Sequence, residues 1–501
     1  MKMQTFTFQM SGLLAALIFC CTAQTFAQEW AWMSGANTVN QTAVYGTQGT
    51  ADPGNVPGAR NGVVGWTDNE GNLWIFGGFG LATTAEFTGR LNDLWKYDVS
   101  TSQWTWMKGA NEINSSGDYG VQGVASPTNE PPSRNRPLNW TDQDGNFWLF
   151  GGLNFNSERL NDLWKYDVAT NQWTWMKGSS TAGPASVGVY GTLGVEDAAN
   201  VPGGRNGGFN WVDNDGNLWL FGGTGFGADD LVQAQLNDLW KYNITTNNWT
   251  WMGGSNTNDP IAPAVYGEFR VPDPANTPGA RVSSVSWTDQ NGDFWLFGGG
   301  FGGGIANRGN DLWKYSVATG MWAWMDGDNI GGQAGVINID EPENPTEDDN
   351  PGARNGSMGW TDNKGNLWLM GGWGLPVLGD TPGFLNDAWI YNPDENLWFY
   401  KAGPLGEIDN PGTYGTQGIP APENAPSGRA AGANMVDNDG LLWLFGGVGG
   451  GRNNDLWQLS GDIFTDLEDI NSKADGIVLN LFPNPNTGSF SLEYKEGKRY
   501  E

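Results

Sequence analysis

The sequence predicts an all-β protein in which six similar sheets form a closed ring. Six near-copies of one unit of about 74 residues run from Trp30 to Leu459 of the 501-residue chain. Each copy contains a Gly-Gly pair, with an arginine seventeen residues before it. The pairs are at 77–78, 151–152, 222–223, 298–299, 371–372 and 446–447, and the arginines are Arg60, Arg134, Arg205, Arg281, Arg354 and Arg429. A repeat of this length, built from short aromatic strands, indicates a ring of equivalent sheets rather than one conventional core.

Each copy is predicted to form one four-stranded antiparallel sheet. In the first copy the strands are residues 60–67, 72–76, 92–98 and 103–107, which are rich in Trp, Tyr, Val and Ile and are separated by turn residues. No segment after the leader shows a helical period. A lone sheet of this kind has uncovered faces and open edges, and a ring protects both. The strand nearest the axis is crowded, so we expect small residues there, as in Asn61-Gly62.

The two ends of the repeat region are predicted to meet. The sixth copy has no Trp-x-Trp strand after Trp457, whereas an unpaired Trp-Ala-Trp-Met segment, residues 30–33, precedes the first copy. We therefore expect the N-terminal strand to complete the last sheet and to close the ring without a covalent bond.

These features resemble the kelch-repeat β-propeller family. The resemblance rests on the Gly-Gly pair after an apolar strand, followed by a Tyr and a Trp with six residues between them, over about 430 residues. The pairs are Tyr97 and Trp104, Tyr166 and Trp173, Tyr242 and Trp249, Tyr315 and Trp322, and Tyr391 and Trp398. Kelch units are usually nearer 50 residues, and the surplus here lies mainly between the fourth strand and the next arginine. The resemblance implies a six-bladed kelch-type β-propeller.

The chain ends differ from the repeat. Residues 1–27 have the pattern of a secretory signal peptide, with Lys2 before an apolar stretch and Thr25-Phe26-Ala27 as a cleavage site. A lipoprotein signal at Cys20 is the weaker alternative, because bulky Phe19 precedes it. We assign 28–460 to the propeller and 461–475 to a linker. Residues 476–501 resemble the start of a type IX secretion sorting domain, a small β-sandwich, through Phe482-Pro483-Asn484-Pro485, Gly488 and Phe490. That resemblance implies export across the outer membrane, followed by release or attachment at the surface.

Composition excludes several kinds of chemistry. The chain has no His, and its two Cys, Cys20 and Cys21, lie in the predicted leader. Copper radical oxidases with kelch repeats need His ligands and a Tyr linked to Cys, so that site cannot form here. Ser-His-Asp triads, Cys nucleophiles and zinc sites with His or Cys ligands are excluded for the same reason. A net charge of −30 disfavours nucleic acid and anionic membranes as partners. We expect no cofactor, although calcium stays possible, and the protein is expected to be a monomer.

One face of the ring is predicted to carry the binding site. The turns between first and second and between third and fourth strands are short, whereas loops such as 79–91, 224–236, 300–309 and 373–385 and links such as 34–59 and 326–353 are long. Binding residues favour variable loops on a rigid scaffold. Two sets of ligand-binding candidates lie there. The aromatic set is Phe79, Phe155, Phe226, Phe301 and Trp373, which either stack on a ligand or plug the loop bases. The six repeat arginines either hold an anion or pair with nearby carbonyls and with aspartates such as Asp93 and Asp162.

Three further motifs are interpreted as structural. A Tyr-Gly turn recurs in five links, at Tyr45, Tyr119, Tyr190, Tyr266 and Tyr414. Turns such as Asp213-Asn214-Asp215-Gly216 lack the downstream Glu of a calcium loop, so they are expected to be hairpin turns. The acidic link 340–349 is more typical of a solvated loop than of a calcium site.

The expected function is non-catalytic binding or adhesion outside the cell. The partner would be an extracellular glycan or protein held on the long-loop face, with the type IX machinery as the export partner and no membrane insertion after signal cleavage. One alternative is a carbohydrate-active enzyme with paired Asp or Glu residues. The other is a structural component of a surface layer. Six nearly equivalent units favour binding, because catalysis usually requires one unit to differ.

Overall fold

The protein is described here from a computed structural model. It describes residues 29–228, 233–257, 262–301, 305–341 and 344–460, together with two short strands at 480–483 and 490–493. The chain divides into two units, of which one is Trp30–Leu459 and the other contains the remaining residues at both ends. In the second unit, β30 (Asn480–Pro483) pairs antiparallel with β31 (Phe490–Glu493). The leader, the linker and most of the predicted sorting domain lie outside the described residues.

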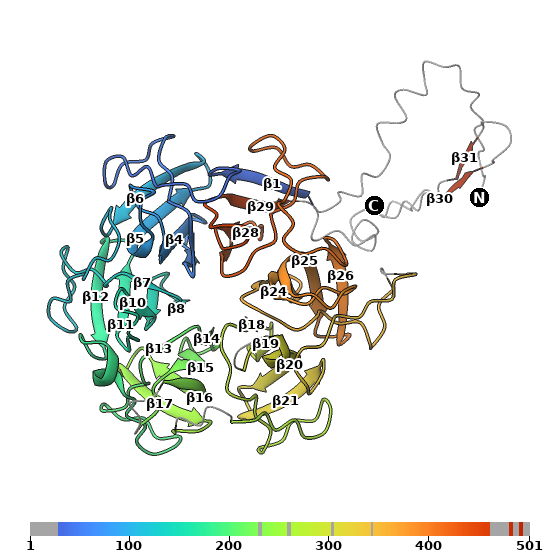
Figure 1. Ribbon diagram of the computed structural model, residues 1–501. Coiled ribbons are helices and arrows are strands. Elements are labelled where there is room, and N and C mark those ends of the chain that lie inside the picture. The colour runs from blue at the N-terminus through green and yellow to red at the C-terminus, as the bar shows by residue number, and fades with distance from the viewer. Residues whose placement is uncertain are drawn as a thin grey trace, which may run out of the picture. The chain divides into compact units, whose positions relative to one another are not determined.

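Six sheets surround a central axis in the unit Trp30–Leu459, which confirms the six-bladed propeller (Figure 1). Blade 1 contains β2 (Arg60–Asn61), β3 (Val64–Thr67), β4 (Leu73–Gly80), β5 (Gly89–Asp98) and β6 (Gln103–Lys108). Blade 2 contains β7 (Arg134–Asn135), β8 (Leu138–Thr141), β9 (Phe147–Phe150), β10 (Leu153–Asn154), β11 (Leu163–Asp167) and β12 (Gln172–Lys177). Blade 3 contains β13 (Arg205–Asn206), β14 (Phe209–Val212), β15 (Leu218–Gly225), β16 (Ala234–Asn243) and β17 (Asn248–Gly253).

The remaining blades repeat this order. Blade 4 contains β18 (Val285–Thr288), β19 (Phe294–Gly300), β20 (Arg308–Ser316) and β21 (Met321–Asp326). Blade 5 contains β22 (Arg354–Asn355), β23 (Met358–Thr361), β24 (Leu367–Gly374), β25 (Gly383–Asn392) and β26 (Leu397–Ala402), and blade 6 contains β27 (Ala433–Val436), β28 (Leu442–Phe445), β29 (Leu456–Ser460) and β1 (Glu29–Ser34). Two short 3₁₀ helices, η2 (Gly183–Ser186) and η3 (Ile305–Asn307), lie in loops. Among the described residues, no helix is long and apolar enough to cross a membrane.

The N-terminal strand completes the last blade, as predicted. The sheet order of blade 6 is β1-β29-β28-β27, so the two ends of the ring meet in one sheet. The indole of Trp30 contacts that of Trp457 edge-on, at 6.4 Å between ring centroids. Asn424, in the last blade-to-blade link, donates a 2.9 Å hydrogen bond to the backbone carbonyl of Trp30. The closure therefore combines backbone pairing, aromatic packing and a buried amide.

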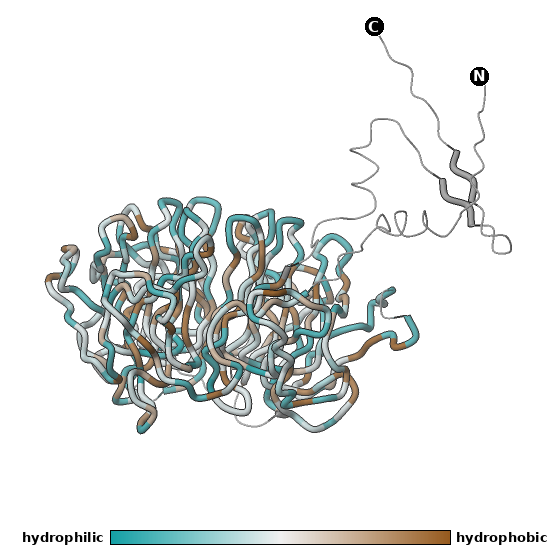
Figure 2. Tube along the Cα trace, turned by 90° about the horizontal axis from the view of Figure 1, so that it is seen from above, coloured by the Kyte–Doolittle hydropathy of each residue, from teal (hydrophilic) through white to brown (hydrophobic). Residues whose placement is uncertain are grey.

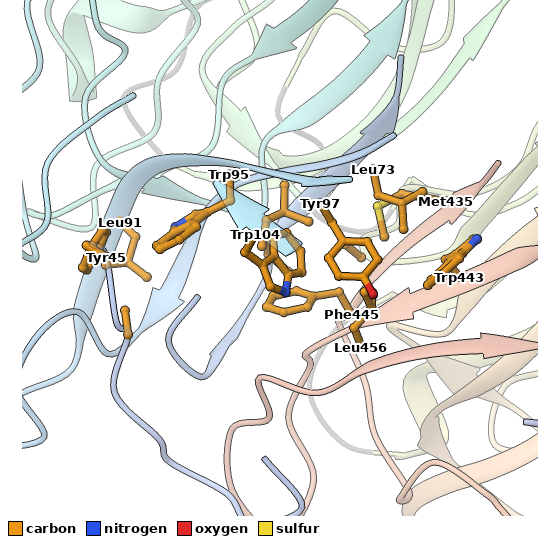
Figure 3. Close-up of a cluster of buried hydrophobic side chains, with 14 of the residues drawn as sticks. Tyr45, Leu73, Leu91, Trp95, Tyr97, Trp104, Met435, Trp443, Phe445 and Leu456 are labelled. Atoms are coloured by element: carbon orange, nitrogen blue, oxygen red, sulfur yellow. The ribbon is translucent and has the colours of Figure 1, made fainter. Parts of the chain in front are cut away.

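Aromatic side chains fill the spaces between blades. Figure 3 shows the space between blades 6 and 1, where Tyr97 and Trp104 of blade 1 lie against Trp443 and Phe445 of blade 6. The innermost strands add a hydrogen bond at each step, such as the one from Trp66 Nε1 to the carbonyl of Trp140 in the next blade, at 3.0 Å. Burial of many large aromatic side chains is a major source of stability for a ring that has no disulfide in its described part.

The predicted first strand is broken in two by a left-handed residue. In blade 1 this is Gly62 (φ 64°), between β2 and β3. The equivalent residues of the six blades form what we call the axial belt: Gly62, Arg136, Gly207, Ser283, Gly356 and Ala431, all with φ between 53° and 70°. The backbone N–H of each donates to the carbonyl of the belt residue in the preceding blade, at 2.7–3.0 Å, and the six hydrogen bonds form a closed circle. The small residues expected at the axis are explained by this backbone conformation as well as by crowding.

The two faces of the ring differ as the sequence predicts. The antiparallel register places the β4–β5 loop and the blade-to-blade links on one face and the short β3–β4 and β5–β6 turns on the other. In each β3–β4-type turn an aspartate accepts a hydrogen bond from a tryptophan indole, as Asp68 does from Trp74 at 2.8 Å. Amides in these turns reach the next blade, such as Gln290 Nε2 to the Asn363 carbonyl. Figure 2 shows the ring edge-on, with loops projecting from both faces.

Candidate functional site

The six repeat arginines are buried structural residues. A hydrogen bond explains the constant separation of seventeen residues. Nη1 of each arginine donates to the carbonyl of the first glycine in its Gly-Gly pair, at 2.9–3.2 Å. Each guanidinium also holds an aspartate with two hydrogen bonds of 2.6–2.9 Å. The pairs are Arg60–Asp93, Arg134–Asp162, Arg205–Asp238, Arg281–Asp311, Arg354–Asp387 and Arg429–Asp455, and all six arginine side chains are at most 1% exposed. Their donors are already engaged, so we do not retain them as ligand-binding residues.

Each of these aspartates also organises neighbouring aromatic residues. Asp238 accepts hydrogen bonds from the Tyr190 hydroxyl at 2.6 Å and from Trp240 Nε1 at 2.7 Å. Burial, with the nearby Asp238 carboxylate adding to it, holds the pKa of Tyr190 well above its usual range, so the hydroxyl stays protonated and donates. The recurrent Tyr-Gly turn is thereby a structural element in five blades. In blade 5 the corresponding residue is Ile337, which follows Val336 as Tyr45 follows Val44.

The five candidate aromatic residues do not form one ring. Phe79 and Trp373 occupy the same position, opposite Asn61 and Asn355 of the first strands. Leu153 and Thr224 take that position in blades 2 and 3. Phe155 and Phe226 stand two residues after Leu153 and Thr224, so they lie further along the loop than Phe79 and Trp373 do. Phe155 is 40% exposed, whereas Phe226 is buried at 1% and Phe301 is partly buried beside a pocket of about 300 Å³.

A second set of arginines, which the sequence reasoning missed, gathers near the axis on the long-loop face. They lie at the start of the third strand or just before it, three residues before the paired aspartate, and we call them the mouth arginines: Arg90, Arg159, Arg308 and Arg452. Blade 3 has Gln235 and blade 5 has Phe384 at this position. The signal was present in the sequence as the repeated pattern Arg-x-Asn-Asp.

The mouth arginines reach across to the next blade. Nε of Arg90 donates to Asn135 Oδ1 at 3.2 Å, and Nε of Arg308 and Arg452 donate to Asn355 and Asn61 at 2.8 and 3.1 Å. Arg159 donates to the Thr224 carbonyl at 2.9 Å. Three of these guanidiniums also lie over the candidate aromatic rings. Arg308 lies 4.1 Å from the centroid of Trp373, and Arg452 and Arg90 lie 4.6 and 5.6 Å from that of Phe79. Stacking of this kind fixes the plane of a guanidinium.

Arg136 is a fifth arginine at this end of the axis. It is the one large side chain of the axial belt, and its Cγ lies 2.9 Å from the point where a Cβ on Gly62 would stand. Among the recorded ion pairs of the described residues, none involves Arg136, Arg90, Arg159 or Arg452. Burial lowers the pKa of each of these guanidiniums, and no neighbouring carboxylate offsets that effect. We call the area formed by Arg136 and the mouth arginines the axial mouth.

The interior of the ring below the belt is neutral and polar. A cavity of about 220 Å³ is lined by residues of all six innermost strands, including Asn139, Asn210, Ser286 and Asn434. These side chains bond to the neighbouring blade, as Asn210 Nδ2 does to the Asn139 carbonyl at 2.5 Å. The lining contains no charged residue, so the concentration of charge belongs to the axial mouth.

The acidic motifs show no site for a metal. The described residues contain no group of three or more His, Cys, Asp or Glu side chains that could hold an ion. The Asp-x-Asp-Gly segments are hairpin turns, as predicted, and their first aspartates are engaged with backbone N–H groups, as Asp213 is with Asp215 and Asn217. In the acidic link, Asp349 is buried and accepts hydrogen bonds from Asn338 and Thr346.

Asp326 should make the stability of the protein depend on pH. Asp326 is on the outermost strand of blade 4, at the position that carries a lysine in blades 1 and 2. Burial raises the pKa of Asp326 to about 7, although Arg270 and the N–H of Gly327 act in the opposite direction. In the unfolded chain the pKa of an Asp carboxyl is about 3.9. Between about pH 3.9 and about pH 7, therefore, Asp326 is protonated in the folded protein but ionised in the unfolded chain. The contribution of Asp326 to the free energy of unfolding is therefore full below about pH 4 and is lost as the pH rises to about 7.

Asp326→Asn should remove this loss. Relative to the unsubstituted protein, the variant should gain about 2–4 kcal/mol between pH 4 and pH 8, measured as the free energy of urea unfolding at each pH. Glu112→Gln, at an exposed side chain that is not among the charges acting on Asp326, is the control and should show a flat difference. A flat difference for Asp326→Asn as well would contradict the raised pKa.

The comparison with family models agrees with the fold. The family model described as "Kelch motif" matches residues 143–174, which lie in blade 2. The chain is similar to multiple epidermal growth factor-like domains protein 8, at 28% identity over 182 residues for the Homo sapiens protein and 31% over 107 residues for the Mus musculus protein. These matches cover 36% and 21% of this chain but 5% and 3% of those proteins, so the chain corresponds to a small part of their length.

A solved structure titled "Structure of YjhT" aligns over 80% of this chain and 95% of its own, with 16% identity and a TM-score of 0.46. The repeated blades and the matched motif define the class of the protein. It is a six-bladed β-propeller with a kelch motif in blade 2.

Proposed function

We propose that the protein is a secreted or cell-surface binding propeller that recognises glycan on its long-loop face without catalysis. The leader pattern and the resemblance of residues 476–501 to a type IX sorting domain support export. The single observation that carries the binding role is the difference between the faces. The tight-turn face is tied together by amides from blade to blade, whereas the long-loop face carries the axial mouth and exposed aromatic side chains.

Two exposed phenylalanines extend the site outward from the axial mouth. Phe155 is 40% exposed in the blade 2 loop, and Phe87 is 63% exposed in the β4–β5 loop of blade 1. An exposed aromatic ring on a rigid loop base is suited to stacking on the apolar face of a sugar. Such residues cost little to remove from the fold, so they can be tested without unfolding the protein.

The full chain should bind a subset of glycans on an array and should release no product from them. Phe155→Ala should weaken that binding about 5- to 30-fold, as loss of about 1–2 kcal/mol of ring contact implies. Phe269→Ala is the matched control, because Phe269 is 45% exposed and lies in a blade-to-blade link against Trp324. Binding that survives both changes equally would place the site elsewhere.

The same array distinguishes the alternatives. Cleavage of a bound glycan, abolished by one Asp or Glu substitution, would identify a carbohydrate-active enzyme. Self-assembly of the purified protein into ordered sheets, with no glycan retained, would identify a surface-layer component.

A further inference from the structure

We propose that the axial mouth binds the carboxylate group of an acidic saccharide, with Arg136 at the centre and the mouth arginines around it. This inference rests on the proposed function, to which it adds the chemical class of the ligand. It starts from the distribution of charge. Twelve arginines lie between Trp30 and Leu459, of which six are the buried repeat arginines, five form the axial mouth and the other is Arg270.

The charge of the axial mouth is unusual for this protein. The chain carries a net charge of −30, yet Arg90, Arg136, Arg159 and Arg452 have no acidic partner in the recorded ion pairs of the described part. Partly buried cations are costly unless an anion accompanies them. In the same molecule, every repeat arginine receives its own aspartate. These four arginines lack an acidic partner although the protein is rich in Asp and Glu. We therefore infer that their anion is supplied by a ligand.

The backbone of Arg136 gives an independent argument. Five of the six belt residues are Gly, Ser or Ala, whereas Arg136 adopts the same left-handed conformation, with φ of 53°. That conformation disfavours a long side chain, and strained residues of this kind concentrate at functional sites. Glycine at the equivalent position in three other blades shows that the fold does not need an arginine there.

The geometry suits a carboxylate. Nε of Arg90, Arg308 and Arg452 donates to an asparagine oxygen, and the guanidinium of each of these three lies over Phe79 or Trp373. A guanidinium held in one plane, such as that of Arg452, presents N–H groups as a fork that matches the two oxygens of a carboxylate. In Arg90 the two Nη groups donate to the Phe155 carbonyl and the Ser157 hydroxyl, so this side chain contributes mainly its charge. The surrounding asparagine side chains and backbone carbonyls are neutral, which suits the hydroxyl groups of a saccharide rather than a second charge.

The test compares two substitutions with the same chemical change. Arg136→Gly and Arg270→Gly each remove one arginine from a left-handed position at which several other copies carry glycine, and Arg270 has φ of 62°. Arg270 lies in a blade-to-blade link, where it contacts Asp326 and Glu347. Both variants of the full chain should retain the β-sheet circular dichroism of the parent, and Arg136→Gly should melt at the same or a higher temperature because the strained side chain is gone.

Binding is measured by calorimetry with a linear oligosaccharide of hexuronic acid units. The carboxyl-reduced neutral form of the same oligosaccharide, a sulfated oligosaccharide and a poly-glutamate peptide of equal length are the comparisons. The uronate should bind at least tenfold more tightly than its neutral form. Arg136→Gly should weaken uronate binding at least tenfold, Arg452→Ala should weaken it several-fold, and Arg270→Gly should change it less than twofold.

Several outcomes would overturn the inference. Equal binding of the uronate and its neutral form, or equal effects of Arg136→Gly and Arg270→Gly, would show that the axial mouth does not hold a carboxylate. Tighter binding of the sulfated oligosaccharide or the peptide would show that the ligand class is wrong. No uronate binding by a protein that still retains neutral glycans on the array would overturn this inference alone, whereas no binding to any glycan would overturn the proposed function as well.

Discussion

Deletion of β1, residues Glu29–Ser34, should destabilise the propeller more than any loop deletion of the same length. The deletion removes the outer strand of blade 6, exposes the edge of β29 and takes away the ring contact between Trp30 and Trp457. It also leaves the buried Asn424 amide without the Trp30 carbonyl that it donates to. Loss of one buried tryptophan alone costs about 3–5 kcal/mol, so we expect a loss of at least about 5 kcal/mol in the free energy of unfolding.

The matched control is a six-residue deletion of residues 83–88. All six are exposed in the β4–β5 loop, and changes in the length of such a loop cost little. Urea unfolding of the two variants, followed by tryptophan fluorescence, gives the comparison. A synthetic peptide with the sequence of residues 29–36 should raise the unfolding midpoint of the β1 deletion by restoring the missing strand. Equal midpoints for the two deletions would contradict the two-ended blade.

Asp238→Ala should cost about 4 kcal/mol or more, because it leaves a buried charge without its partner. Arg205 would keep its guanidinium at 0% exposure with no carboxylate, and both the Tyr190 hydroxyl and Trp240 Nε1 would lose their acceptor. The measurement is again the free energy of urea unfolding. Asp197→Ala, at an exposed aspartate in the link that leads into the same blade, should change it by less than about 1 kcal/mol.

The fifth blade supplies an internal comparison for this prediction. Asp387 pairs with Arg354 and accepts from Trp389, but Ile337 stands where the tyrosine would be. Asp387→Ala should therefore cost about 1–2 kcal/mol less than Asp238→Ala, the amount of one hydrogen bond to a charged group. If Asp238→Ala were no more harmful than Asp197→Ala, the buried pair would not be a source of stability.

Features that repeat with a fixed spacing could be predicted from the sequence. Arg60 and Gly77, seventeen positions apart, are joined by a hydrogen bond in the structure. The unpaired Trp30 segment likewise indicated that it would pair with the strand of the last blade, β29. The alternative role for the arginines, pairing with Asp93 or Asp162, was also visible in the sequence, because every copy has both the repeat arginine and an aspartate two residues before the Trp of the third strand. Because the same contact forms in every blade, the two residues that make it recur at a constant spacing, and the contact can be predicted from the sequence.

Features that depend on local backbone conformation could not be predicted in this way. Phe79 and Phe226 both follow a Gly-Gly pair, yet one lies at the axial mouth and the other is buried, because they differ by two residues in register. The importance of Arg136 depends on a positive φ that a sequence shows only indirectly, through the glycines of other copies. Arg90 and its equivalents were overlooked because they stand where long loops of different length rejoin the strands.

The axial belt has a consequence for how this protein can diversify. Its hydrogen bonds use backbone atoms alone, so the circle survives whatever side chain each of its six positions carries, within the limits of a left-handed residue. The side chain at each belt position can therefore change without altering the strands of its blade. Relatives, or engineered versions, could exchange Gly207 or Ser283 for Asn, Asp or His and acquire a new selectivity at the centre of the ring while every strand stays in register.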